Sequence, residues 1–299
     1  MIKKAITVLF LFASFITVSQ TRYVDRVFEN VAVKTYNYSI KDKDTLKLDL
    51  YQPVKDSILN RALFVIVHGG GFTSGERNDG ASIYLAENIA RKGFVVASID
   101  YRLVKNKPIN CSYLASDKQK AFNNAAEDLL NALLFIVKRK NNFLIDDTKI
   151  ILSGASAGAE TVLNVVYNRD LVVKNKDFYK DIKPAGIISL SGAVFKPEMI
   201  VKENAIPTVL YHGVNDKVVP YGTSSHQSCM PTAPGFMLLS GSKVISEKLE
   251  SLNCSFLLHS YLNRGHDIFN LPIEDFYQGF VFINNTVFNK KFYQAKVTQ

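Results

Sequence analysis

The sequence predicts an α/β fold in which a mostly parallel central sheet carries helices on both faces. Short apolar runs typical of buried strands alternate with longer amphipathic segments typical of helices, from residue 31 to the end of the chain. The 299 residues are 47% hydrophobic and 21% charged, which is ordinary for a globular protein. No internal repeat or linker rich in Pro, Gly or Ser divides them, so we expect a single domain over residues 20–299.

Residues 1–19 have the pattern of a secretory signal peptide. Lys3 and Lys4 precede an apolar run over residues 5–18, and the small residues Thr17 and Ser19 suit cleavage by signal peptidase. A membrane anchor is the alternative, but the run is shorter than the roughly 20 residues that a spanning helix needs. No later stretch is long and apolar enough to span a bilayer. We therefore expect export to the periplasm or extracellular space, without stable membrane insertion.

The first half of the chain opens with a predicted antiparallel hairpin whose second strand, LKLDLY, alternates apolar and polar residues. Continuous apolar runs then predict buried parallel strands, and a helix between them is closed by Gly93. The expected elements are hairpin strands at Val31–Ile40 and Thr45–Tyr51, buried strands at Ala62–Val67 and Phe94–Ile99, and a helix at Ser82–Lys92.

The clearest helix signal covers Lys118–Lys140, where apolar residues from Phe122 to Ile136 share one face, and Ser116 with Gln119 fits a capping box. Strands and helices then continue to alternate. The remaining expected strands are Ile150–Leu152, Ile187–Leu190, Thr208–Tyr211 and Phe256–Tyr261, and the remaining helices are Thr161–Tyr167, Ser242–Leu252 and Glu274–Phe288.

The formal charge of +9 is spread over scattered lysines and arginines, which indicates a solvated surface. No basic run is interleaved with aromatic residues, so we expect no nucleic-acid partner. Any attraction to anionic polysaccharides or membrane surfaces would arise only from the electrostatic field of the net positive charge. No CxxC or Cys/His spacing suggests zinc, and we expect neither a metal nor an organic cofactor.

The residues Gly154-Ala155-Ser156-Ala157-Gly158 form a G-x-S-x-G motif between a predicted strand, KIIL, and a predicted helix, ETVLNVVY. In this setting the serine sits on a sharp strand-to-helix turn with its hydroxyl exposed. The alternative is a Gly-rich turn with an inert serine. The context favours Ser156 as a nucleophile.

A glycine loop, His68-Gly69-Gly70-Gly71-Phe72, directly follows the predicted strand FVIV. Consecutive glycines allow backbone amides to point at one spot and bind an oxyanion, together with the amide that follows the nucleophile. A phosphate-binding loop is the alternative, but neither of its usual patterns is present. We expect His68 to brace this loop by hydrogen bonds.

Asp216 and His266 each follow a predicted strand, so that the order along the chain is Ser156, Asp216, His266. This is the order of nucleophile, acid and base in α/β-hydrolases. Less well placed alternatives remain. They are His226 for the base, Asp100, Asp170 and Asp267 for the acid, and His212 and His259, which we expect to be structural.

The motifs HGGGF, DYR at Asp100–Arg102, GASAG, HGVND and GHD resemble the carboxylesterase and lipase branch of the α/β-hydrolases. They are especially similar to hormone-sensitive-lipase-like esterases and to bacterial acetyl or feruloyl esterases acting on carbohydrate, a group that LKLDLYQP also fits. The resemblance covers nearly the whole mature chain. It implies oxyanion donors at Gly70, Gly71 and Ala157, and a triad of Ser156, Asp216 and His266. The chain departs from the pattern in an insertion at Val219–Leu239, and it lacks a large helical cap before Ala62, which favours an open site.

The resemblance implies a serine carboxylesterase that works through an acyl-enzyme. Two alternatives come from other classes of protein. The first is a serine peptidase of the prolyl-oligopeptidase type, which the absence of an N-terminal propeller disfavours. The second is a non-catalytic binding module on the same scaffold, although such modules usually lack one member of the triad.

Three cysteines follow the signal peptide: Cys111, Cys229 and Cys254. The first two lie in loops at the carboxyl ends of predicted strands, and Cys254 lies at the opposite edge. Cys111–Cys229 is therefore the expected pair if a disulfide forms, and three reduced thiols are the alternative.

Ligands enter this kind of sheet at the carboxyl ends of its strands. We therefore expect the long loop Val219–Leu239 and the segment Val104–Ser116 to border the entrance. Their aromatic and hydroxyl side chains would suit a sugar or an aryl group, although aromatic residues could equally anchor the loop. The expected substrates are short-acyl or aryl-acyl esters on carbohydrate, and the residues expected at the entrance are Tyr113, Tyr221, Ser224, Ser225, His226 and Phe236.

Overall fold

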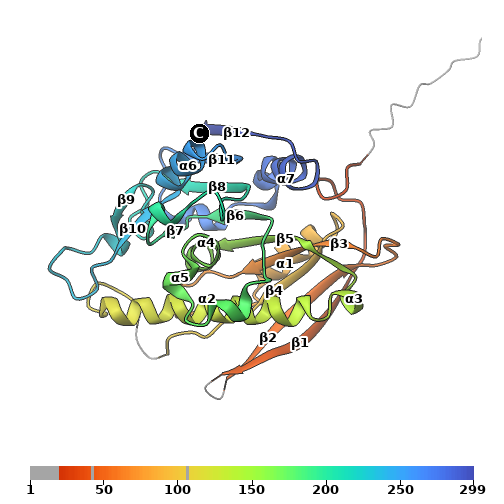
Figure 1. Cartoon of the computed structure of the whole chain (residues 1–299), viewed down its shortest axis with the longest axis horizontal. Helices are drawn as coiled ribbons and strands as arrows, with labels where there is room; N and C mark the ends of the chain where they lie inside the picture. The colour runs from red at the N-terminus through yellow and green to blue at the C-terminus, as the bar shows by residue number, and fades with distance from the viewer. Residues whose placement is uncertain (1–19, 42–43, 106–107) are drawn as a thin grey trace, which may run out of the picture.

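The computed structural model describes residues 20–41, 44–105 and 108–299, so the predicted signal peptide lies outside the described residues. Within this part, nine strands form one sheet, and Figure 1 shows it from the β1–β2 hairpin at the bottom of the view to β12 at the top. In spatial order the strands are β1 (Val31–Lys41), β2 (Asp44–Pro53), β4 (Val95–Ile99), β3 (Arg61–Val67), β5 (Ile145–Ala155), β6 (Gly186–Leu190), β8 (Thr208–Gly213), β11 (Phe256–Tyr261) and β12 (Gln294–Thr298).

The sheet is mostly parallel, as the sequence predicts. Only β2 runs against its neighbours, pairing antiparallel with β1 and β4, and every other neighbouring pair is parallel. All seven residues of β3 are buried. A strand buried on both faces needs no polar alternation, which is why RALFVIV is a continuous apolar run after its first residue.

Helices cover both faces of the sheet, and successive residues of each strand enter different cores. In β3, Leu63 and Val65 belong to the core on the side of α2, α4 and α6, whereas Phe64 and Ile66 belong to the core on the side of α1 and α7. The helices are α1 (Gly80–Ala90), α2 (Ala115–Val137), α3 (Lys140–Phe143), α4 (Ala157–Tyr167), α5 (Arg169–Val172), α6 (Ser242–Ser251) and α7 (Tyr277–Ile283).

Two local predictions about helices are wrong. Helix α2 begins at Ala115, its N-cap Leu114 makes no side-chain cap, and Gln119 instead donates to Asn123, so there is no capping box. The expected last helix is divided into the 3-10 turn Ile273–Phe276, α7 and the π-helical turn Asn284–Phe288. Its apolar pattern continues through all three parts, because each still turns an apolar side toward the sheet.

The segment 219–239 is not a structureless loop. It contributes β9 (Thr223–Ser225), which pairs with β10 (Leu238–Gly241), and β10 also pairs with β7 (Ala193–Val194). Neither this small sheet nor β12 is predicted from the sequence, because their strands are short and lack an apolar run. Among the described residues, no helix combines the length and apolarity required to cross a bilayer.

Candidate active site

Ser156 occupies the turn between β5 and α4, where its backbone has φ 52° and ψ −122°. A left-handed φ is unfavourable for serine, and it persists because the surrounding structure holds the turn. The Ser156 amide donates to Leu190 O at 2.9 Å, and the residue is 8% exposed. The turn therefore has the geometry of a nucleophile elbow.

The two glycines of the G-x-S-x-G motif are required by close packing. A Cβ on Gly158 would lie 2.0 Å from Val67 O, and a Cβ on Gly154 would lie 2.3 Å from the backbone of Gly158. Helix α4 can therefore start directly beside the end of β3. This contact brings the serine next to the glycine loop.

The glycine loop turns sharply at Gly70, which has φ 102°, and its carbonyl accepts from Thr73 N and Ser74 N. Within the described chain, the amides of Gly70, Gly71 and Ala157 donate to no protein acceptor. Gly70 and Gly71 line the same cavity as Ser156, whereas Ala157 is buried at the start of α4. These three amides are free to bind an oxyanion.

His68 and Tyr101 brace this loop. The His68 ring stacks on Tyr101 with centroids 4.3 Å apart, and its Nδ1 lies 2.8 Å from Gly69 O. The Tyr101 hydroxyl donates to His68 O and Gly69 O, both at 3.1 Å. The bracing role expected for His68 is confirmed. Tyr101 belongs to the DYR motif, but nothing in the sequence indicates this bracing role.

Gly70→Ala is expected to lower kcat about 10²–10³-fold, the loss that follows removal of one oxyanion donor. A Cβ at this position would lie 2.1 Å from Ser74 O, and alanine disfavours φ 102°, so the loop must move. Steady-state kinetics with an aryl ester measures the loss. Gly80→Ala is the control, because a Cβ there meets nothing within 4 Å. Equal activity of both variants would mean that the Gly70 amide takes no part.

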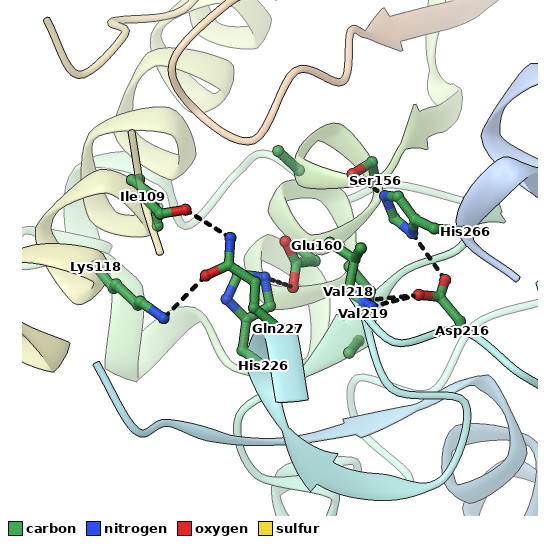
Figure 2. Close-up of polar contacts among 12 residues, drawn as sticks. Ile109, Lys118, Ser156, Glu160, Asp216, Val218, Val219, His226, Gln227 and His266 are labelled. Atoms are coloured by element: carbon green, nitrogen blue, oxygen red, sulfur yellow. Dashed lines mark hydrogen bonds and ion pairs between the residues drawn. The ribbon is translucent and has the colours of Figure 1, made fainter. Parts of the chain in front are cut away.

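The structure brings Ser156, His266 and Asp216 together. Ser156 Oγ lies 2.8 Å from His266 Nε2, and His266 Nδ1 lies 2.8 Å from Asp216 Oδ2. Figure 2 shows the three side chains in line. They come from β5–α4, from the loop after β8 and from the loop after β11, all at the carboxyl ends of parallel strands.

The Asp216 carboxylate accepts further hydrogen bonds. Its Oδ1 accepts from Val218 N at 2.8 Å and Val219 N at 3.0 Å, and His212 Nε2 lies 3.4 Å from Oδ2. Burial alone would raise the pKa of Asp216, but the bonds from His212 and His266 hold this pKa well below its ordinary value. Asp216 is therefore anionic at neutral pH. His212, expected to be only structural, contacts the acid four residues away.

The other candidates lie in different environments. The buried His226 points at Glu160, with Nε2 3.5 Å from Oε1, and burial lowers the pKa of His226 to about 3. His259 stacks on Tyr211. The acidic alternatives pair with basic side chains: Asp100 with Arg77, Asp170 with Lys176, and Asp267 with Arg264.

A cavity of about 670 Å³ opens beside Ser156 and His266. The glycine loop forms one side, and two apolar walls face it. One wall comes from α1, and the other from residues 269–276, directly after His266. The apolar side chains that form these walls are Tyr84, Leu85, Phe269, Leu271, Ile273 and Phe276.

The predicted border of the entrance is wrong. None of Tyr113, Tyr221, Ser224, Ser225, His226 and Phe236 lines this cavity, and its nearest lining residue in the sequence is Val218, just before the long loop. Tyr221, Ser224 and Ser225 instead line a separate hollow of about 200 Å³ beside Asp216. The sequence places these loops at the carboxyl edge of the sheet, but it does not reveal on which side of the serine they fold.

The expected Cys111–Cys229 disulfide is confirmed, and Cys254 is free and half-buried. The bridge joins the long loop to the segment before α2.

Comparison with known proteins agrees with this geometry. The BD-FAE family model matches residues 48–194, just under half of the chain, including the glycine loop and Ser156. Probable carboxylesterase 6 of Arabidopsis thaliana is 32% identical over 124 residues, which cover 39% of this chain and 33% of the Arabidopsis protein. The chain thus matches about a third of the length of that relative.

Among solved structures, esterase 2 of Thermogutta terrifontis phosphorylated by paraoxon superposes with a TM-score of 0.62 at 18% identity, covering 88% of this chain and 96% of that one. Its butyrate-bound form gives 0.59 at 16% identity, covering 87% and 95%. At this identity the likeness shows the fold. The fold is that of these solved esterases, and the partial matches to the BD-FAE family model and to the carboxylesterase support an esterase-like α/β-hydrolase of the carboxylesterase and lipase-like branch.

Proposed function

We propose that the chain is a serine carboxylic-ester hydrolase with Ser156 as nucleophile, His266 as base and Asp216 as the acid that orients the base. The observation that carries the proposal is the hydrogen-bond chain joining these residues at the wall of an apolar cavity. An anionic Asp216 keeps the proton of the neutral imidazole on Nδ1. Nε2 is then free to accept the Ser156 proton.

The reaction proceeds by two acyl transfers. Ser156 Oγ bonds to the ester carbonyl carbon while His266 Nε2 takes its proton, and the amides of Gly70, Gly71 and Ala157 bind the oxyanion. The carbon–oxygen bond to the alcohol then breaks, and the alcohol leaves with the proton from His266. Water repeats the sequence, releasing the acid and restoring Ser156. No step requires a metal or an organic cofactor.

The proposed substrates are short-acyl or aryl-acyl esters. A volume of about 670 Å³ lies within the range of small-ligand pockets, and the walls offer apolar side chains to an acyl or aryl group. Thermogutta terrifontis esterase 2 has been solved with butyrate bound, which is consistent with a small acyl group in this fold. Carbohydrate as the alcohol rests on the resemblance of the motifs, since the loop aromatics do not line the cavity.

The proposal includes export. The basic and apolar start of the sequence has the form of a cleavable signal, and the Cys111–Cys229 disulfide suits an oxidising compartment such as the periplasm or the extracellular space. The substrate would then be a small-molecule or glycan ester outside the cytoplasm.

A fluorophosphonate probe is expected to label Ser156 and abolish ester turnover, because it reacts with an activated serine hydroxyl. The similar Thermogutta esterase is phosphorylated by paraoxon. Peptide mapping of the labelled protein identifies the modified residue. A protein that is folded but resists the probe would instead be a non-catalytic binding module.

A substrate panel then tests the acyl and alcohol groups. We expect faster turnover of acetyl, butyryl and aryl-acyl esters than of long-chain esters, with acetylated and feruloylated oligosaccharides included. Preference for long-chain lipid esters would contradict the carbohydrate assignment while leaving the esterase intact. Cleavage of a dipeptide chromophore at a comparable rate would indicate a peptidase.

A further inference from the structure

The position of Asp216 depends on the three residues that follow it, which we call the acid segment (Lys217–Val219). The amides of Val218 and Val219 hold Asp216 Oδ1, so a shift of this backbone moves the carboxylate. The other carboxylate oxygen faces His266. The geometry of the triad therefore depends on what holds the acid segment.

Two of the three carbonyls of the acid segment are held by a clamp formed by Gln227 and Ser228, and the third, Val219 O, lies 3.1 Å from His212 Nε2. Gln227 N donates to Val218 O at 2.6 Å, and Ser228 Oγ donates to Lys217 O at 2.9 Å. Both clamp residues have left-handed backbones, with φ 60° and 53°. Residues other than glycine adopt this conformation reluctantly, so further contacts must maintain it.

The Gln227 side chain supplies those contacts. Its Nε2 donates to Ile109 O at 2.6 Å, and its Oε1 accepts from Lys118 Nζ at 3.2 Å, as Figure 2 shows. Two residues farther on, Cys229 is joined to Cys111. The clamp is thus attached to the segment before α2 by one amide side chain and one covalent bond.

Lys118 is an unusual partner, because it is 0% exposed and burial lowers its pKa. Within the described residues it forms no ion pair with a carboxylate. Its close polar contacts are Gln227 Oε1 and, at 3.7 Å, Cys229 Sγ. Burying an amine costs free energy unless the amine makes polar contacts. The contact with Gln227 therefore indicates that Lys118 serves to hold the clamp.

We propose that Gln227 is a positioning residue for Asp216. Its side chain, held by Lys118, fixes the clamp and thereby the acid segment, so that Asp216 keeps His266 aligned with Ser156. This inference rests on the proposed esterase function. Gln227 does not line the cavity, so it acts on the rate of acyl transfer and not on substrate binding.

Gln227→Met tests the inference, because methionine keeps the length of the side chain and removes both hydrogen bonds. We expect kcat to fall about 10-fold, since displacements well below 1 Å in a catalytic group are costly, with KM little changed. Lys118→Met removes the same contact from the other side. We expect a similar loss of kcat, and the double variant should lose no more than the larger single loss.

The pH profile separates positioning from a merely structural role. A carboxylate favours the protonated form of the imidazole that it faces, so a displaced Asp216 should move the acid limb of the kcat/KM profile to lower pH. The other titratable groups near the triad are His212 on β8, Glu160 on α4, the pair Asp267 and Arg264 beside His266, and His226 and Lys118 beside the clamp. Of the two variants, only Lys118→Met removes a charge, which could itself shift the pH profile. The pH profile of Gln227→Met therefore reports on the position of Asp216 without a change of charge.

Gln52→Met is the matched control, since this half-buried glutamine donates to Phe143 O at 3.0 Å from the far hairpin. The inference would be overturned if Gln227→Met and Lys118→Met kept the kcat and the pH profile of the wild type, even with a lower melting temperature. If Gln227→Met does not fold, the kcat of Lys118→Met tests the inference. If wild-type protein has no turnover that depends on Ser156, the proposed function fails first, and the two failures are thereby distinguished.

Discussion

Ser156→Ala is expected to lower kcat for ester hydrolysis about 10⁶-fold, to a residual rate supplied by substrate binding and the oxyanion amides. In the proposed mechanism the hydroxyl is the only group of the triad that bonds to substrate carbon, and in the variant His266 Nε2 would face a methyl group. Single-turnover and steady-state assays with an aryl ester measure the change. Circular dichroism should show an unaltered fold.

Ser189→Ala is the matched control for this variant. Ser189 lies on the neighbouring strand β6, is also buried, and has a hydroxyl with no hydrogen-bond partner among the described residues. Its loss should leave kcat unchanged. Retention of near wild-type activity by Ser156→Ala would refute the proposed mechanism.

Asp216→Asn is expected to lower kcat about 10⁴-fold while leaving the fold intact. Asp216 accepts on both sides, from the amides of Val218 and Val219 and from the rings of His266 and His212. If the asparagine oxygen stays on the backbone amides, its NH₂ group faces His266 Nδ1. The imidazole then places its proton on Nε2, and it cannot accept one from Ser156.

Kinetics across the pH range measure this loss, and Asp267→Asn serves as its control. Asp267 is the residue next to His266, but its exposed carboxylate bonds to Arg264 and to Gly265 N. We expect that variant to remain active. A loss of less than tenfold in Asp216→Asn would show that another group orients the base.

The sequence predicts those parts of the site in which the local backbone geometry allows only certain residues. The turn at Ser156 needs glycine on both sides because α4 and β3 approach within contact distance, and the glycine loop needs Gly70 for its φ. Asp216 and His266 stand in the shorter motifs HGVND and GHD. They were found because each follows a buried apolar strand, and parallel strands end at the same edge of the sheet.

The parts that were missed depend on contacts between distant segments. Tyr101 braces a loop more than 30 residues away, and Lys118 and Glu160 are buried charged residues that a sequence alone assigns to the surface. The cavity walls were misplaced for the same reason. Strand β12 was missed because QAKVT, at the edge of the sheet, is half exposed and carries no apolar run.

The two walls of the cavity differ in their relation to the proposed catalytic residues. The wall at residues 269–276 continues directly from His266, so a substitution that reshapes it also moves the base. Helix α1 forms the facing wall and carries no proposed catalytic residue. Under the proposed function, a change at Leu85 would alter which acyl groups fit while leaving the catalytic residues in place, and this position is where new substrate preferences would evolve at the least cost in rate.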